Sequence, residues 1–254
     1  MLEITNLSKT YDSKQSKNGM VVDVPTLEKI SLEIKKGEFV SIIGPSGCGK
    51  STLFNIISGL EKPDEGYIKL EGEDITGKKG YVSYMLQRDL LLPWRTVLDN
   101  CILGMEIQGY SRAVCREKAK GLLDEFDLSE YERSYPNVLS GGMRQRVAFL
   151  RTMLFDKKIL LLDEPFGALD AYTKSEMHEW LMSICRKYSL TILFITHDVE
   201  EALLLSDKVY VLSTKPAKVK LVLDVNLPKP RSRESLVDEN FIKLKKKLLH
   251  SLFE

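Results

Sequence analysis

The chain has 254 residues, of which 43% are hydrophobic and 29% are charged, a composition typical of a globular protein. Its 37 basic and 36 acidic residues nearly cancel, so no overall charge favours nucleic acid or an anionic membrane as a partner. The four cysteines form no CxxC pair, and no apolar run approaches the roughly 20 residues that cross a bilayer. We therefore expect a reduced, intracellular chain without a signal peptide, which could act at a membrane only through a partner chain.

The first elements in chain order are strands. Strand-like patterns cover residues 2–7 and 27–34, and the polar stretch at residues 12–24 between them is typical of a surface hairpin or loop. A short apolar strand at residues 38–43 then leads through a glycine-rich turn into a helix that begins near Lys50. This succession of strand, loop and helix is the context that a phosphate-binding loop requires.

The middle of the chain changes to a helical pattern between residues 96 and 151, where apolar residues recur three or four positions apart. Strands return at residues 158–162, 191–196 and 208–212, and a helix-patterned stretch at residues 171–188 separates the first two. Alternation of apolar strand and helix predicts a parallel sheet that is buried on both faces.

The glycine-rich turn carries the clearest chemistry in the chain. It matches the pattern GxxxxGK[ST], and with the next residue it comprises Gly44, Pro45, Ser46, Gly47, Cys48, Gly49, Lys50, Ser51 and Thr52. Glycines allow successive backbone N–H groups to point inward at phosphate oxygens, and the following helix adds the positive end of its dipole. In this pattern Lys50 reaches the β- and γ-phosphates of ATP, and the Ser51 hydroxyl binds Mg²⁺. The Cys48 thiol is expected to have no catalytic part, because the loop acts through its backbone.

A pair of carboxylates, Asp163 and Glu164, directly follows the apolar run at residues 159–162. An apolar strand that ends in aspartate places a carboxylate at the carboxyl edge of a parallel sheet, where Mg²⁺ would lie beside the phosphate loop. Glu164 can then hold and deprotonate the attacking water. An apolar strand followed by two acidic residues would by itself indicate a surface turn. Together with the phosphate loop it predicts hydrolysis.

The string LSGGMRQR at residues 139–146 predicts a second surface for anions. Ser140 is a favourable N-cap, and Gly141 and Gly142 leave backbone amides open at the start of a helix. A plain capped helix would explain the serine, but it would not explain two glycines in the first turn, because glycine there costs stability. We therefore expect Ser140, Gly141 and Gly142 to contact a nucleotide.

With these motifs the sequence resembles the ATP-binding subunits of ABC transporters, in which LSGGM is the signature motif. The remaining motifs occur in the family's order over nearly the whole chain. The resemblance implies that Tyr11 stacks on adenine, that Gln87 in YMLQRD contacts Mg²⁺ or the attacking water, and that His197 in FITHD contacts the γ-phosphate. Residues 168–170 (ALD) match the D-loop of the family.

The resemblance implies an α/β fold: a P-loop NTPase core with a parallel central sheet, an N-terminal antiparallel β subdomain and an inserted α-helical subdomain. We expect a single ABC-type ATPase domain in residues 1–254, with the core and β subdomain in about 1–95 and 152–226, the helical subdomain in about 96–151 and a tail helix in about 227–254. In the tail, FIKLKKKLLHSLF predicts a basic amphipathic helix, for which docking on the protein is favoured over binding at a membrane surface. His178 and His250 are expected to be structural.

The resemblance also implies the partners. In this family two copies pair head to tail, so that residues 140–142 of one copy cover the γ-phosphate held by residues 44–52 of the other. Transmembrane permease subunits receive the motion of that dimer, a solute-binding protein acts through them, and the chain lies peripherally on the cytoplasmic face of the cell membrane. Residues 88–96 (RDLLLPWRT) and the helical subdomain would form the permease surface, with Trp94 either exposed there or packed into the core.

Three strings, LLLPWRTVLDN, YPNVLSGGMRQRVAFLRT and LPKPRSRES, look most like subunits of nitrate, sulfonate and taurine importers, a group that also includes carriers of thiamine precursors. A soluble, non-transport ABC ATPase is the main alternative, although the roughly 90 residues between the phosphate loop and the signature leave no room for the long coiled coil of that class. A small-molecule kinase would leave LSGGM and His197 without a role. A non-catalytic nucleotide sensor would not need Glu164 or His197.

Overall fold

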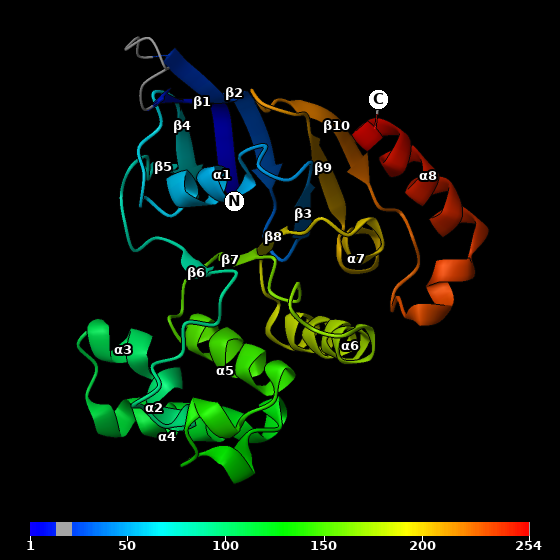
Figure 1. Cartoon of the computed structure of the whole chain (residues 1–254). Coiled ribbons are helices and arrows are strands. Elements are labelled where there is room, and N and C mark those ends of the chain that lie inside the picture. The colour runs from blue at the N-terminus through cyan, green and yellow to red at the C-terminus, as the bar shows by residue number, and fades with distance from the viewer. Residues whose placement is uncertain (14–21, 254) are drawn as a thin grey trace.

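The computed structural model describes residues 1–13 and 22–253, which form two β-sheets and several helices (Figure 1). The strands are β1 (Leu2–Ser13), β2 (Val22–Ile34), β3 (Phe39–Ile43), β4 (Glu65–Leu70), β5 (Glu73–Asp74), β6 (Ser83–Met85), β7 (Leu160–Asp163), β8 (Ile192–Ile195), β9 (Lys208–Leu212) and β10 (Val219–Asp224). The α-helices are α1 (Lys50–Ile57), α2 (Val97–Cys101), α3 (Leu103–Ile107), α4 (Arg112–Leu123), α5 (Gly141–Met153), α6 (Ala171–Tyr188), α7 (Val199–Leu205) and α8 (Glu239–Phe253).

The central sheet has the strand order β10-β9-β3-β8-β7-β6 and is parallel except for β10, which pairs antiparallel with β9. Strands β3, β7 and β8 are continuous apolar runs buried along their whole length. Successive side chains point to opposite faces, so Phe194 packs with helices α5 and α6 whereas Leu193 and Ile195 pack with α1. The parallel sheet buried on both faces is therefore confirmed.

The second sheet is antiparallel, with the order β2-β1-β4-β5, and it shares one apolar cluster with α1 and the central sheet. Helix α1 is thus enclosed between the two sheets (Figure 1). The strands predicted at residues 2–7 and 27–34 were too short, because β1 and β2 stay paired as far as Ser13 and Val22. The outer half of β1 is largely polar, and register shifts between Ile4 and Thr10 interrupt the period-two pattern. Of the hairpin or loop expected at residues 12–24, residues 14–21 lie outside the described residues.

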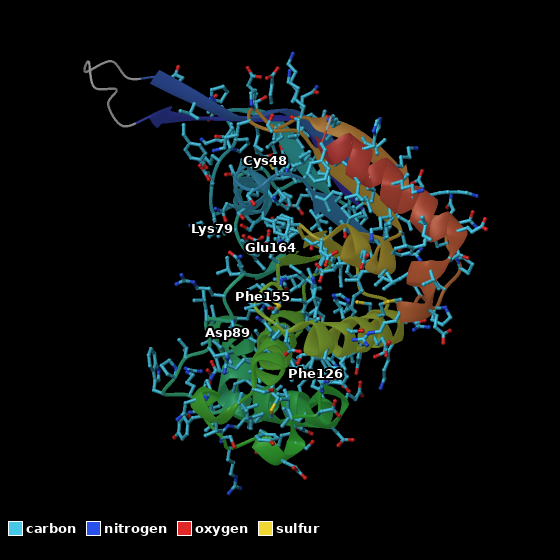
Figure 2. All side chains as sticks on the ribbon, turned by 45° about the vertical axis from the view of Figure 1, so that its right-hand side comes forward. Cys48, Lys79, Asp89, Phe126, Phe155 and Glu164 are labelled. Atoms are coloured by element: carbon cyan, nitrogen blue, oxygen red, sulfur yellow. The ribbon has the colours of Figure 1, made fainter. Side chains whose placement is uncertain are left out.

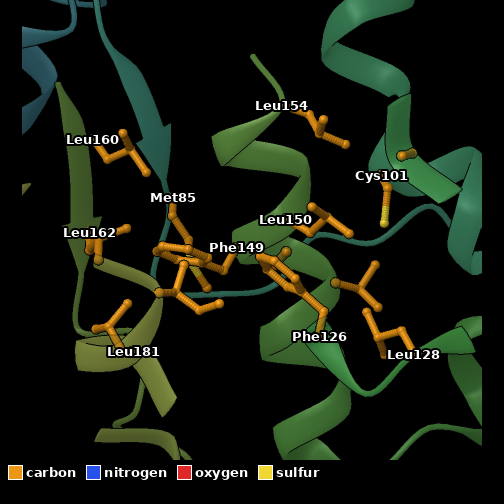
Figure 3. Packing of buried hydrophobic residues seen from close by; sticks show 14 of the residues in the cluster. Met85, Cys101, Phe126, Leu128, Phe149, Leu150, Leu154, Leu160, Leu162 and Leu181 are labelled. Carbon is orange, nitrogen blue, oxygen red and sulfur yellow. The ribbon is translucent and has the colours of Figure 1, made fainter. Parts of the chain in front are cut away.

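The helices α2 to α5 form the lower part of Figure 1 and join the sheet through α5 and α6. Phe149 of α5 lies 6.3 Å from Phe126 between ring centroids, and the Trp180 ring of α6 meets both rings edge-on at 5.5 and 5.2 Å. Figure 3 shows Phe149 between this helical core and the side chains of Met85, Leu160 and Leu162 from the sheet. Because each fully buried side chain of this size contributes about 2 kcal/mol, this cluster fixes the helical region to the core.

The C-terminal tail docks on the core through α8. Phe241 and Leu248 are fully buried in a cluster with α7, β9 and β10, whereas Lys243, Lys246 and Lys247 face the solvent. The favoured interpretation of this amphipathic helix as a docked helix is confirmed, and β10, which leads to it, is an element that the sequence pattern did not predict. No helix within residues 1–13 and 22–253 combines the length and the apolar character needed to span a membrane.

Candidate active site

Four of the predicted motifs meet at the carboxyl edge of the central sheet. The phosphate loop follows β3, Gln87 follows β6, Glu164 follows β7 and His197 follows β8. The strands are paired in register up to this edge, since Ile195 lies opposite both Ile42 and Asp163. Figure 2 labels Cys48 of the phosphate loop and Glu164 near the junction of the β-sheets and the helical region. Parallel strands present their loops at the same edge, which is where α/β proteins bind ligands.

The phosphate loop is closed by Lys50, whose Nζ donates hydrogen bonds to the carbonyls of Gly44 at 2.8 Å and Pro45 at 3.0 Å. Gly49 has φ +123°, and a Cβ there would lie 2.8 Å from Leu27, so both backbone conformation and space require glycine. At Gly47, by contrast, there is space for a Cβ, because no other atom would lie within 4 Å of it. Helix α1 carries no acidic residue in its first turn, so the positive end of the helix faces the loop uncompensated.

Asp163 is a buried carboxylate beside the loop. Tyr84 donates its hydroxyl to Asp163 Oδ2 at 3.2 Å, and Ser51 hydrogen-bonds to the same carboxylate. Burial raises the pKa of Asp163, while the hydrogen bonds from Ser51 and Tyr84 oppose that rise. Burial and the neighbouring Asp163 raise the pKa of Tyr84, which therefore stays a neutral donor. No motif pointed to Tyr84, which only the pairing of β6 with β7 brings to Asp163.

The oxygen ligands beside the loop suit a hard cation. Ser51 and Asp163, two of the predicted Mg²⁺ ligands, are in direct contact, and both offer oxygen atoms. Among the described residues no group of three or more His, Cys, Asp and Glu side chains could hold a metal. Mg²⁺ is usually bound by one or two protein groups together with substrate phosphates and water, and Ser51 and Asp163 could supply those groups.

The three predicted catalytic side chains Gln87, Glu164 and His197 come together at one carboxylate oxygen. Glu164 Oε2 accepts from Gln87 Nε2 at 3.4 Å and lies 3.2 Å from His197 Nδ1. Glu164 has φ +44°, an unfavourable conformation for a non-glycine residue, and its backbone is held there by hydrogen bonds to Ile195 and Gly167. Backbone strain of this kind concentrates at functional sites.

Tyr11 lies near the end of β1 in the antiparallel sheet and is 37% exposed. Its hydroxyl donates to Glu61 Oε2 at 2.5 Å, and Lys9 Nζ lies 5.5 Å from the ring centre. Partial burial and the hydrogen bond to Glu61 raise the pKa of Tyr11. Thr52, on the first turn of α1, also contacts this hydroxyl, so the ring lies beside the phosphate loop. The sequence pattern gave no sign of Glu61.

The signature residues do not join this cluster. Ser140 caps α5 by accepting from the Met143 N–H at 3.3 Å, as predicted. A Cβ at Gly141 would lie 3.1 Å from Leu169, and one at Gly142 would lie 3.0 Å from Thr173. Close packing against the D-loop and α6 is therefore a second reason for the two glycines, beside the open amides inferred from the sequence.

The segment after Gln87 is held by α5. Arg144 Nε donates to Asp89 Oδ2 at 3.2 Å, and Arg151 donates to the Leu90 carbonyl at 2.9 Å.

Two further predictions concern single side chains. Trp94 is 72% exposed, so the alternative that this side chain packs into the core is wrong. His178, expected to be structural, is buried and hydrogen-bonded to Glu201.

Comparison with known proteins decides the family. The sequence model described as ABC transporter matches residues 27–167. The chain belongs to the ABC transporter family. It is similar to curated import subunits over most of its length. It is 42% identical to the aliphatic sulfonates import ATP-binding protein SsuB of Bacillus cereus, over 98% of this chain and 94% of the relative. It is 44% identical to the nitrate import ATP-binding protein NrtD of Synechocystis sp., over 89% of this chain and 83% of the relative.

Solved ABC structures agree. A dimeric ABC transporter cassette superposes with a TM-score of 0.74 at 30% identity and covers 90% of this chain and 100% of its own. The same values hold for a post-hydrolysis state of an ATP-binding cassette bound to ADP and Pi. The chain is therefore an ABC-type ATPase, and the predicted fold class of a P-loop NTPase core with a β and a helical subdomain is confirmed.

Proposed function

We propose that this ABC ATPase binds MgATP at the carboxyl edge of the central sheet and hydrolyses it to energise an importer of the nitrate, sulfonate, taurine or thiamine-precursor type. The convergence of Gln87 and His197 on Glu164 beside the phosphate loop carries the catalytic part. The importer part rests on the relatives, which are named as import subunits for aliphatic sulfonates, nitrate and formylaminopyrimidine. These relatives favour an importer over a soluble ATPase.

The loop and Tyr11 bind the nucleotide in this proposal. The backbone amides of residues 44–52 and the start of α1 receive the phosphates, and the Lys50 ammonium neutralises the β- and γ-phosphates. The exposed Tyr11 ring offers a face for adenine, and its hydrogen bond to Glu61 restricts the side chain. A restricted aromatic side chain loses less entropy on binding than a free one.

Glu164 performs the chemistry by accepting the proton of the attacking water. A carboxylate in this position contributes about 10²- to 10⁴-fold as a general base. His197 and Gln87, which lie against its Oε2 atom, orient the carboxylate and contact the γ-phosphate and the water. Ser51, Gln87 and Asp163 would hold Mg²⁺, which would supply positive charge to the phosphates.

A second copy completes the site. Ser140, Gly141 and Gly142 begin α5 away from the cluster around Glu164, and the solved cassettes to which the chain is similar include a dimer. We therefore propose a head-to-tail dimer in which these residues cover the γ-phosphate bound by the other copy. ATP then closes the dimer and hydrolysis releases it.

A permease is the proposed membrane partner, with a solute-binding protein acting through it. A groove of about 290 Å³ runs between the core and the helical region, and its apolar lining includes Leu60, Val82, Leu103 and Phe155. Trp94, which is 72% exposed, adds a large apolar side chain to the segment that follows Gln87. Exposed apolar surface of this kind fits a short helix of a membrane subunit. The chain would then lie peripherally at the cytoplasmic face of the membrane.

Product analysis tests the proposal. The full chain with ATP and Mg²⁺ should release inorganic phosphate, and chelation of the metal should stop the release. Lys50→Ala should weaken ATP binding about 10- to 100-fold, because a charged group's hydrogen bonds contribute about 1.5–3 kcal/mol. Transfer of phosphate to a small-molecule acceptor, or ATP binding without any turnover, would contradict the proposed function.

A further inference from the structure

The His197 side chain is held by few contacts within the described part of the chain. Its side chain is 58% exposed, and the contact with Glu164 is its one hydrogen bond within the described part of the chain. A catalytic group that is misplaced by about 1 Å can lose about 100-fold in rate. The orientation of His197 must therefore come from the backbone on either side of it, at Thr196 and Asp198.

Both neighbours of His197 are fixed by polar contacts that are buried or partly buried. The Thr196 hydroxyl, on a residue that is 1% exposed, accepts from the Asp198 N–H at 3.0 Å and donates to Glu201. The Asp198 carboxylate caps α7, accepting from the Glu200 N–H at 2.9 Å and the Glu201 N–H at 3.3 Å. One hydroxyl and one carboxylate thus hold the backbone around the histidine.

Glu201 is the centre of these contacts and is only 4% exposed. Its Oε1 lies 2.7 Å from His178 Nε2 and 3.6 Å from Lys174 Nζ, while its Oε2 accepts from Thr196. Lys174 also pairs with Asp198 at 2.8 Å. Lys174 and His178 are one turn apart on α6, so the same face of that helix holds both carboxylates.

A buried carboxylate stabilises the fold little, because its desolvation offsets much of the stabilisation that its hydrogen-bond and ion-pair partners contribute. An apolar side chain of similar size could fill the space between α6 and α7 at lower cost. The Glu201 carboxylate, unlike an apolar side chain, fixes the orientation of the Thr196 hydroxyl. It thereby also fixes the start of the loop that carries His197.

We infer that Glu201 is a positioning residue for His197, acting through Thr196 and held in place by His178 and Lys174 of α6. This inference rests on the proposed function, in which His197 takes part in ATP hydrolysis. It assigns to the polar network between α6 and α7 a role in the reaction.

Kinetics of Glu201 variants test the inference. Glu201→Ala should lower kcat at least about tenfold while KM for ATP stays within about twofold, because the phosphate loop is untouched. Glu201→Gln still accepts the Thr196 hydrogen bond and should keep kcat within about threefold of the wild type. Glu200→Gln is the matched control, since this neighbouring carboxylate pairs with Lys245 at the surface. Its kcat should equal that of the wild type.

A double-mutant cycle separates positioning from general damage to the fold. In a His197→Ala background, Glu201→Ala should lower kcat no further than about twofold, because the group it positions is gone. Losses that multiply, or a Glu201→Ala protein with unchanged kcat, would overturn the inference. If Glu201→Ala fails to fold, Thr196→Val takes its place in the same cycle with the same expectations.

The same assay distinguishes this inference from the proposed function. If the wild type releases phosphate and every folded Glu201 and Thr196 variant matches it, the positioning role is wrong and the proposed function stands. If the wild type releases none, the proposed function itself fails.

Discussion

Arg231 holds the C-terminal tail on the core and gives a direct test of how the fold is stabilised. The residue is 3% exposed, and its guanidinium donates hydrogen bonds to the carbonyls of Leu203 at 3.0 Å, Ser206, Val225 at 2.8 Å and Leu227 at 3.3 Å. The first two carbonyls lie at the end of α7, and the other two precede the turn toward α8. One side chain therefore satisfies the backbone of both segments.

Arg231→Met replaces the unbranched stem of the side chain by an apolar one and removes these donors. Each buried carbonyl left without a partner costs about 1–3 kcal/mol, while the loss of a buried charge returns part of that cost. Burial lowers the pKa of Arg231, because it removes water from the charged form. We expect a net loss of about 3 kcal/mol in the free energy of unfolding. At about 2–4 °C for each kcal/mol, this lowers the midpoint of thermal unfolding by about 6–12 °C.

Thermal unfolding followed by circular dichroism measures the effect. Arg233→Met is the matched control, because Arg233 lies two residues further on and is exposed. Substitution there should change the free energy of unfolding by about 0.5 kcal/mol or less. A midpoint for Arg231→Met within about 2 °C of the wild type, or an equal loss in both variants, would refute the reasoning.

Two further predictions concern the active site and the permease surface. Because burial raises the pKa of Asp163, its ionised form destabilises the fold at pH values above that pKa. Asp163→Asn should therefore raise the unfolding midpoint of the nucleotide-free chain by about 2 °C at neutral pH, and this gain should disappear as the pH falls through the raised pKa of Asp163. The same substitution should abolish Mg²⁺-dependent turnover. A lower midpoint at neutral pH would contradict this prediction. Trp94→Ala should weaken co-purification with the permease while the Kd for ATP stays within about twofold, whereas Phe253→Ala, at an exposed position on α8, should affect neither. Equal loss of both properties in Trp94→Ala would indicate misfolding instead of a lost contact.

The elements that the sequence predicted are those whose signals are local. Strand β3 and the start of α1 follow from an apolar run and a glycine turn, and α6 begins after Asp170, whose side chain accepts from the Tyr172 and Thr173 N–H groups. Strand β10 was missed because it pairs antiparallel at the edge of the sheet and is largely exposed, so its apolar run is only the three residues Leu221–Leu223. The proposed subdomain boundaries stay predictions.

The candidate site likewise contains some residues that the sequence predicted and others that it did not. Lys50, Asp163 and Glu164 lie in motifs whose spacing indicates their chemistry, and the structure places them at one edge of the sheet. Glu61 and Glu201 could not be predicted, because a glutamate in a charged stretch resembles a solvated surface residue until the fold brings Tyr11 or Thr196 to it. The contacts of Glu61 with Tyr11 and of Glu201 with His178 join residues that are 50 and 23 positions apart in the chain.

Glu164→Gln tests most directly whether ATP is hydrolysed at this site and whether a second copy completes it. The substitution keeps the shape of the side chain and removes the base, so turnover should fall about 10²- to 10⁴-fold while ATP still binds. Light scattering should then show twice the monomer mass in the presence of ATP, and Ser140→Arg in the same background should restore the monomer by blocking the signature surface. A Glu164→Gln protein that binds ATP and stays monomeric at high concentration, or that hydrolyses ATP at the wild-type rate, would contradict this mechanism.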